Sequence, residues 1–341
     1  MTRSPVLRVI QLKKVAALEL HSAYVALAEL RAPEDPPILL VAQAEAHLSL
    51  GASQWASAEL DRHRCQSLGV TVVQRSLGGG LVWLEPAHLN YFFLQSPQGN
   101  CRCPKDLLRV LSPGIIATHA AFGFPVSLRD HQEFSYQGRR IGSTGAATLG
   151  HSLVLAGSFL LEGDWDTFCQ AVAAPSDGFR AQLALGLEES LCTWQEVMAR
   201  PVSAEAVFAV WQEELKRTGW VLLEDGLSVQ EQERMDAMDW EPLDWESSGR
   251  RRVAHGIKLR SRAFLTERHW DDGWLRIWTE DHRLRALWGS AIPAELTLAS
   301  AGLARDGTLL QDLMQGYLGK GAQLWWERMQ ALAVWSDVPI G

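Results

Sequence analysis

Strand-like and helix-like segments alternate along the first half of this chain, and this alternation constrains the fold more than any other feature of the sequence. Strands are predicted where β-branched, aromatic or alternating apolar residues lie between turn residues, at 6–12, 38–41, 47–50, 70–74, 88–95 and 152–162. Helices are predicted between them at 17–30, 54–68 and 104–111. Pro113-Gly114 is expected to stop or kink the last of these, with 115–121 as its candidate continuation. Interleaved elements of both kinds predict a mixed α/β or α+β domain.

The second half of the chain indicates a further domain. A length of 341 residues corresponds to roughly two domains. Helices are predicted at 164–173, 188–199 and 203–217, and the polar stretch 239–252 is the best linker candidate. Beyond it, paired strands are predicted at 274–279 and 284–288, and helices at 308–317 and 322–334. We therefore expect one domain at 1–245 and a small α+β domain at 250–341.

Composition excludes several classes of protein. With 40 acidic and 32 basic residues the net charge is −8, which disfavours generic binding to nucleic acid or to anionic membranes. The apolar runs are short, and no signal-peptide hydrophobic region follows the first residues. We expect a cytoplasmic protein that contacts neither membrane nor nucleic acid. The five cysteines are scattered, and no His or Cys group has the spacing of a metal site, so no metal ligand is assigned.

The most informative segment is the glycine stretch at 72–83, in which Gly78, Gly79 and Gly80 are consecutive. Three glycines between two predicted strands allow a ligand to lie directly on the backbone, and Arg75 just before them supplies a cation for an anionic group. The stretch is neither a Walker P-loop nor a dinucleotide fingerprint. On its own it is also compatible with a bare glycine turn.

Two later segments strengthen this signal. One is Gly-Arg-Arg-Ile-Gly-Ser-Thr-Gly at 138–145, and the other is Val-Leu-Ala-Gly-Ser-Phe-Leu-Leu at 154–161. Together with the glycine stretch they resemble motifs of the lipoate-protein ligase family, part of the biotin/lipoate ligase superfamily. Its members carry an Arg-Arg-x-x-Gly-Gly-Gly-Ala-Val loop, a Gly-Arg-Lys-Ile-Ser-Gly-Ser-Ala loop and a His-Gly-Thr-Leu-Leu-Leu strand in this order.

The resemblance implies a fold, a reaction and a set of site residues. The fold is α+β, a mixed β-sheet flanked by helices, with a catalytic domain at 1–245 and an accessory domain at 250–341. The reaction activates lipoate or octanoate with ATP and Mg²⁺ to acyl-AMP, then transfers the acyl group to a lysine of a lipoyl-domain acceptor protein. Substrate and adenylate binding fall, position by position, on Arg75, Ser76, Gly78, Gly79, Gly80, Arg139, Ser143, Gly157 and Ser158.

The chain departs from these motifs at several positions. Arg140 stands where the family has a lysine, and we expect its guanidinium to take over the stabilisation of phosphate charge, although its planar fork differs from a compact ammonium. Gln74 replaces the first arginine, Leu84-Glu85 replaces His-Asp, and Ala156 replaces a histidine. Gly142-Ser143 also reverses the Ser-Gly order.

Two other functions stay open, and the departures favour the first of them. One is a non-catalytic acyl-binding or partner homologue that keeps the fold. The other is an octanoyl or lipoyl transferase, which needs an activated cysteine near the acyl pocket, whereas no cysteine lies just ahead of the 138–145 segment. The basic run Arg250-Arg251-Arg252 is similarly open, as a solvated hinge or as a docking point for an acidic carrier domain.

Overall fold

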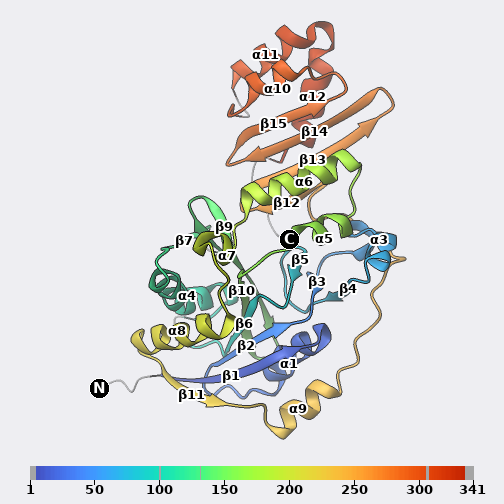
Figure 1. Cartoon of the computed structure of the whole chain (residues 1–341). Coiled ribbons are helices and arrows are strands. Elements are labelled where there is room, and N and C mark those ends of the chain that lie inside the picture. The colour runs from blue at the N-terminus through green and yellow to red at the C-terminus, as the bar shows by residue number, and fades with distance from the viewer. Residues whose placement is uncertain (1–4, 100, 131, 305–306, 335–341) are drawn as a thin grey trace.

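An eight-stranded mixed sheet forms the centre of the larger part of the molecule (Figure 1). The structure, a computed structural model, describes residues 5–99, 101–130, 132–304 and 307–334. Across the sheet the strands are β11 (Val221–Asp225), β1 (Val6–Val15), β2 (Ile38–Ala44), β6 (Leu89–Gln95), β10 (Ser152–Phe159), β9 (Arg139–Leu149), β8 (Glu133–Tyr136) and β7 (Ser127–Arg129). β1 runs parallel to β2 and β11, whereas the other neighbours are antiparallel. The expected α+β class with a mixed sheet is confirmed.

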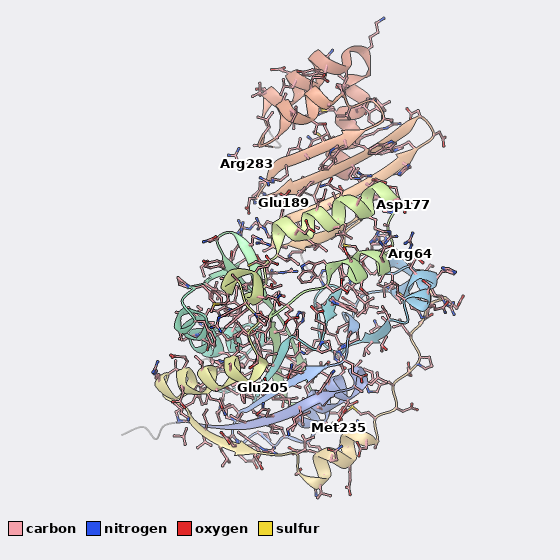
Figure 2. All side chains as sticks on the ribbon, viewed as in Figure 1. Arg64, Asp177, Glu189, Glu205, Met235 and Arg283 are labelled. Atoms are coloured by element: carbon pink, nitrogen blue, oxygen red, sulfur yellow. The ribbon has the colours of Figure 1, made fainter. Side chains whose placement is uncertain are left out.

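Helices cover both faces of this sheet because the central strands are apolar on both sides. In β6, Tyr91 and Phe93 point to one hydrophobic cluster and Phe92 and Leu94 to another, as the two-residue period of a strand requires. The first cluster is covered by α4 (Pro104–Ala121) and α8 (Ala204–Arg217). The second is covered by α1 (Ala17–Leu30) and α9 (Val229–Asp236), and Figure 2 labels Met235 on α9.

A three-stranded sheet beside the large one carries the glycine stretch. Its order is β4 (Thr71–Gln74), β3 (His47–Leu50) and β5 (Val82–Leu84). The single helix expected at 54–68 is instead two short helices, α2 (Ala56–Glu59) and α3 (Arg62–Ser67). They are separated because Leu60 forms a β-bridge with Val172 and Asp61 caps α3 by accepting from the Arg64 amide.

The C-terminal part is a four-stranded antiparallel sheet with helices on both faces. Its strands are β12 (Gly256–Arg260), β13 (Ala263–Trp270), β14 (Gly273–Glu280) and β15 (Arg283–Gly289). One face packs on α10 (Ala294–Ser300), α11 (Thr308–Leu318) and α12 (Ala322–Leu332). The other packs on α6 (Asp177–Ser190), which follows α5 (Trp165–Ala171). Figure 2 labels Asp177 and Glu189 at the two ends of α6.

Three segments differ in detail from the sequence predictions. α4 is one helix through Pro113 to Ala121, so Pro113 does not stop it, because Leu107, Leu111 and Ile115 bury one continuous apolar face on the sheet. The helix expected at 188–199 is divided between α6 and α7 (Trp194–Met198), since Leu191 bridges Arg140 and the Cys192 amide donates to the Arg140 carbonyl at 2.9 Å. β12 and β13 were not anticipated. Among the described helices, none is long and apolar enough to cross a bilayer.

Candidate functional site

The glycine stretch is held in place by the side chain that precedes it. The Arg75 guanidinium donates through Nη1 to the Ser49 carbonyl at 2.6 Å, and through Nη2 to the carbonyls of Gly78 and Gly80 at 2.9 and 2.7 Å. Arg75 is 8% exposed, and burial lowers its pKa to about 10. The cation expected to bind an anionic ligand is therefore engaged with the loop itself, and it fixes the direction of the glycine backbone.

Gly79 is the residue of this loop that tolerates no side chain. Its φ is +105°, in the region that favours glycine, and a Cβ there would lie 2.8 Å from Nη2 of Arg75. The neighbouring strand end is equally tight, because a Cβ on Gly51 would meet the Gly79 carbonyl oxygen at 2.2 Å. The close packing of backbone against guanidinium thus explains why glycine occupies position 79.

The second motif lies in a hairpin and a strand and forms no loop of its own. The hairpin joining β8 and β9 turns at Gln137 and Gly138, both with positive φ, and β9 begins at Arg139. Successive strand residues point to opposite faces, so Arg139 and Arg140 separate. Arg139 turns outward and donates to Glu196 Oε2 at 2.8 Å and to the Glu188 carbonyl at 2.9 Å.

Arg140 points into a cavity. Its Nε is buried and has no hydrogen-bond partner within the described residues. Desolvation lowers its pKa, whereas the nearby Glu133 carboxylate raises it. A partly buried guanidinium with an unsatisfied donor is suited to an anion delivered by a ligand.

Strand pairing brings the third motif to the same place. Thr144 of β9 lies opposite Gly157 of β10, so Ser143, Gly157 and Ser158 meet at one wall. A Cβ on Gly157 would approach the Tyr91 hydroxyl oxygen to 2.3 Å and the Ser143 carbonyl oxygen to 2.9 Å. Glycine is needed at position 157 because β6 and β9 both approach the strand closely there.

The cavity of about 230 Å³ collects most of the expected site residues. Its walls include these expected residues: Arg75, Gly78, Gly79, Gly80, Arg140, Ser143, Gly157 and Ser158. Ser76 and Arg139 are not among its lining residues. Three segments that are far apart in the sequence therefore meet around one cavity.

Two apolar regions and one polar region make up the walls. The α1-side region belongs to the cluster under α1 and consists of Leu77, Val82, Leu84, Phe92 and Ala156. The α6-side region belongs to the cluster around α5, α6 and β12 and consists of Leu81, Trp83, Trp165, Phe168, Leu187, Leu191, Ile257 and Leu259. β5 serves both regions because Trp83 points away from Val82 and Leu84. Polar residues, among them Arg140, Ser143 and Thr144, line the rest.

Several lining residues were missed from the sequence. Arg252 and Lys258 come from the C-terminal segment, and β12 itself forms part of the wall. Arg252 lies against the glycine stretch, since its Cδ would be 3.9 Å from a Cβ on Gly80, and its amide donates to Glu59 Oε1 at 2.7 Å. Arg252 therefore contributes to the cavity wall, and both interpretations of the basic run stay predictions. No motif could have located these residues, because they contribute through tertiary packing.

Glu133 is a further missed residue with an unusual environment. It is 3% exposed, and its Oε2 accepts from the Ser261 amide at 2.8 Å. Its Oε1 has no hydrogen-bond partner in the described ranges, and Glu133 lines the cavity. Mg²⁺ is typically held by one or two carboxylates together with phosphate oxygens and water. Glu133 fits the requirement for a carboxylate, and the phosphate of a ligand bound near Arg140 would supply the phosphate oxygens.

The cysteines do not form a nucleophilic site. Burial raises the pKa of Cys65 and Cys192 to about 11 and that of Cys169 to about 12. None of the described residues lining the cavity is a cysteine. Burial thus disfavours these three thiols as the nucleophile that a transferase needs.

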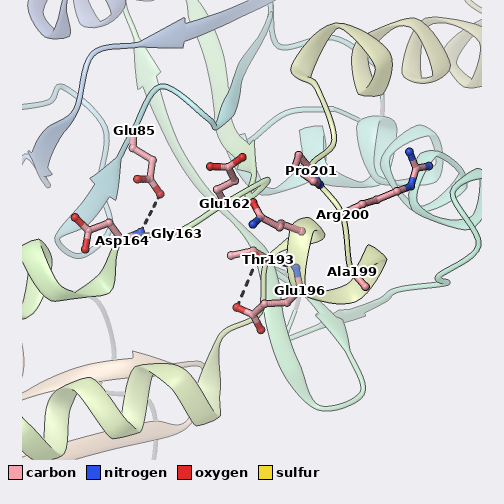
Figure 3. A pocket seen from close by; sticks show the side chains of 10 residues that line it. Glu85, Glu162, Gly163, Asp164, Thr193, Glu196, Ala199, Arg200 and Pro201 are labelled. Atoms are coloured by element: carbon pink, nitrogen blue, oxygen red, sulfur yellow. Dashed lines mark hydrogen bonds between the residues drawn. The ribbon is translucent and has the colours of Figure 1, made fainter.

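A second cleft, of about 580 Å³, carries the opposite charge (Figure 3). Its walls include the acidic residues Glu85, Glu162, Asp164 and Glu196, and a single cation, Arg200. Glu85 Oε1 accepts from the Asp164 amide at 3.2 Å, and the Thr193 hydroxyl lies 3.5 Å from Glu196 Oε1. None of the expected site residues lines this cleft, and its charge disfavours an anionic ligand.

Several solved structures share the fold of this chain. The chain resembles a bi-partite lipoate protein ligase from Thermoplasma acidophilum, studied with its E2 lipoyl domain, with 18% identity, a TM-score of 0.61 and coverage of 69% of this chain and 91% of that one. A lipoate-protein ligase A bound with ATP matches with 16% identity, a TM-score of 0.58 and coverage of 68% and 93%. P. falciparum LipL1 in complex with lipoate matches with 10% identity and a TM-score of 0.54, over 95% of this chain and 99% of that one. At these identities the likeness establishes the fold. No curated protein matches this chain.

The family itself is settled by the sequence model of the lipoyl protein ligase A/B catalytic domain. That model matches residues 16–216, which is more than half of the chain. The matched range contains the glycine stretch and both later motifs, so it covers the expected site residues around the cavity. The chain therefore belongs to the lipoyl protein ligase A/B catalytic domain family.

Proposed function

We propose that this protein is an acyl-adenylate-forming lipoate-protein ligase that activates lipoate or octanoate with ATP and transfers the acyl group to a lysine of a lipoyl-domain acceptor. One observation carries the proposal: a single cavity is lined by two separate apolar regions and by the cations Arg140, Arg252 and Lys258. An acyl-adenylate carries matching chemistry, an apolar chain, a heteroaromatic base and an anionic phosphate between them. Domain 1–245 holds the motifs, and domain 250–341 closes the site.

In the first step the acid's carboxylate oxygen attacks the α-phosphorus of ATP, and pyrophosphate leaves. This chain's contribution is positioning and charge stabilisation. Arg140 stabilises the negative charge that develops on the α-phosphate oxygens. Lys258 and Arg252, from the C-terminal segment, add positive charge. Mg²⁺ bound to ATP supplies additional charge neutralisation, with Glu133 as the protein carboxylate that would hold it.

In the second step the acceptor lysine's amine attacks the acyl carbonyl carbon, and AMP leaves with the bonding electrons. The developing oxyanion and the departing phosphate need donors in fixed positions. Arg140 and the backbone amides of the glycine stretch are placed along the same cavity, and Arg75 keeps that backbone rigid through its bonds to Gly78 and Gly80.

A direct assay tests this function. Purified protein is incubated with ATP, Mg²⁺, lipoate or octanoate and several lipoyl-domain acceptors, and intact-mass spectrometry follows the acceptor. We expect a mass increase equal to one acyl group on the acceptor lysine, dependent on ATP. Absence of both acyl-AMP and acceptor modification with every acceptor would refute the proposal.

A non-catalytic homologue is the second candidate, and one observation favours it. Arg140 replaces the family's lysine, while Arg75 is committed to its own loop. Calorimetry separates the two functions, because tight binding of a lipoyl-AMP mimic without turnover is expected only for the homologue. The transferase is disfavoured by the raised pKa values of the buried thiols, and acyl transfer without ATP that disappears on thiol alkylation would restore it.

A further inference from the structure

One small residue in the floor of the cavity leaves room above it. Ala156 of β10 lines the cavity and is partly exposed, although β10 lies between β6 and β9 in the middle of the large sheet. The motif that this strand resembles has a histidine at this position, so the side chain here is smaller. A central strand residue beneath a helix is normally covered on all sides, so the partial exposure of Ala156 marks open space in the cavity above its methyl group.

The strands of this floor lead from the polar wall of the cavity to the α1-side region. Along β9 the lining residues run from Arg140 through Ser143 to Gly145. Along β10 they run from Ser158 to Ala156, and Ala156 lies opposite Gly145. Residues two apart on a strand are separated by about 6.7 Å, so Ala156 lies that far beyond Ser158 in the direction away from Arg140. A chain whose carboxyl end is held near Arg140 and Ser158 therefore passes Ala156 with its distal half.

The side chains of the two apolar regions assign the acyl chain to the α1 side. The α6-side region presents the indole rings of Trp83 and Trp165 and the phenyl ring of Phe168, which are flat surfaces suited to a heteroaromatic base. The α1-side region is mostly aliphatic. Two histidines border it, and both are neutral near pH 7 because burial lowers the pKa of His21 and of His47. An uncharged, aliphatic region suits the apolar chain of the acid.

The groups on either side of Ala156 are fixed, so the space above it cannot close around a narrow chain. Phe92 lies opposite Ala156 on β6, and its ring stacks on the fully buried ring of Tyr24 with 4.5 Å between the centroids. On the β9 side, the Gly78 carbonyl oxygen would be 3.3 Å from a Cβ on Gly145, and the arginine that anchors the glycine stretch holds this carbonyl. A gap whose walls do not relax loses van der Waals contacts, which weakens binding of a ligand that leaves it empty.

We propose that Ala156 sets the width of the acyl subsite, and that the acid activated here carries a ring or a branch in the distal half of its chain. The inference rests on the proposed function and chooses between its two substrates. Lipoate ends in a ring, which fills the space above Ala156, whereas straight octanoate leaves that space empty and binds less tightly. Because the selection depends on shape, a ring made only of carbon should be accepted as well as the dithiolane of lipoate.

The test compares ligands first on the wild-type protein and then on a variant with the space filled. Acyl-sulfamoyl-adenosines, stable mimics of the acyl-adenylate, are made from octanoate, from lipoate and from pentanoate with a terminal cyclopentyl group, which has the ring without the sulfur. Calorimetry on wild type should give both ring compounds roughly tenfold or more tighter binding than the octanoyl compound. Ala156→Leu should weaken both ring compounds by roughly tenfold or more and leave the octanoyl compound within about threefold of wild type.

The outcomes separate this inference from the function beneath it. Equal binding of the three compounds to wild type, a preference for the lipoyl compound alone, or a preference that Ala156→Leu leaves unchanged overturns the role of Ala156 and leaves the ligase proposal intact. No binding of any mimic to wild type overturns the ligase proposal and this inference with it. Ala156→Val adds less volume and should reduce the preference in part, which decides the matter if the leucine variant does not fold. Ala209→Leu, on the exposed surface of α8, is the matched control and should retain the preference.

Discussion

Glu133 and Ser261 join the two halves of the site: Oε2 of Glu133 accepts the Ser261 amide at 2.8 Å across 128 positions of sequence. Two further contacts hold the turn at Ser261 and Arg262, because the Ser261 hydroxyl donates to Asp130 at 2.6 Å and Arg262 pairs with Asp130. β12 is thereby held against β8, and the residues preceding Ser261 become a wall of the cavity. Residues of the C-terminal segment therefore line the cavity together with residues of the large sheet.

Lys258→Met should slow formation of the acyl-adenylate by about tenfold to a hundredfold, because one cation facing the phosphate is removed while the length of the side chain is kept. Pyrophosphate release measured under saturating acid reports this step. Lys216→Met is the matched control, since Lys216 lies exposed on α8 and pairs with Glu213. Equal rates for both variants would mean that β12 only shapes the cavity.

Arg140→Met should lower adenylation by about a hundredfold or more, because the guanidinium is the charged group of the second motif that points into the cavity. Arg140→Lys should retain most of the rate, since a compact ammonium keeps the charge. Arg139→Met should behave like wild type, because its side chain pairs with Glu196 on the surface. A slower rate for Arg139→Met than for Arg140→Met in the pyrophosphate-release assay would contradict this assignment.

The sequence predicted the part of the site that depends on local backbone. Gly79 and Gly157 were recognisable because positive φ and close strand packing leave room only for glycine, and such positions mark a motif. The assignment of Arg139 to binding stays a prediction that the geometry does not favour. The period of a strand would have separated it from Arg140 if the 138–145 segment had been recognised as a strand.

The other half of the site could not be predicted, since it arises from tertiary contacts alone. Lys258 lies on a strand that was not anticipated. Glu133 is joined to the C-terminal segment by its hydrogen bond with the Ser261 amide, a contact that the sequence does not reveal. His21 occurs in an ordinary Ala- and Leu-rich helix. Its contact with His47 cannot be predicted without the position of β3. Helix α4 shows the same limit, because burial of its apolar face outweighs the missing amide of Pro113.

Gly79→Ala should destabilise the protein by roughly 1–3 kcal/mol and abolish binding of an acyl-adenylate mimic, because the added Cβ forces a disfavoured φ and displaces Arg75. Gly226→Ala, outside the cavity, is the matched control. Its Cβ would have no heavy atom within 4 Å, and its φ is not positive. Urea unfolding and calorimetry on both variants check the difference, and similar losses in the two would contradict the role of Arg75 as the loop's anchor.

His119 should make the protein less stable in mild acid. Its Nδ1 donates to the Ile115 carbonyl at 2.8 Å, its ring packs on Phe159 and Trp194, and burial lowers its pKa to about 4. Below the unfolded-state pKa of about 6.5, the imidazole of His119 is protonated in the unfolded chain but stays neutral in the folded chain. The free energy of unfolding therefore falls as pH drops from 6.5 towards 4. The loss from this one group between pH 7.5 and pH 5 should be roughly 2 kcal/mol. His21 and His47 contribute in the same direction, so the comparison needs His119→Phe, which keeps the ring and removes this titration alone. Urea unfolding at the two pH values should show a smaller loss for the variant, and equal losses would mean that His119 is already solvated in the native protein.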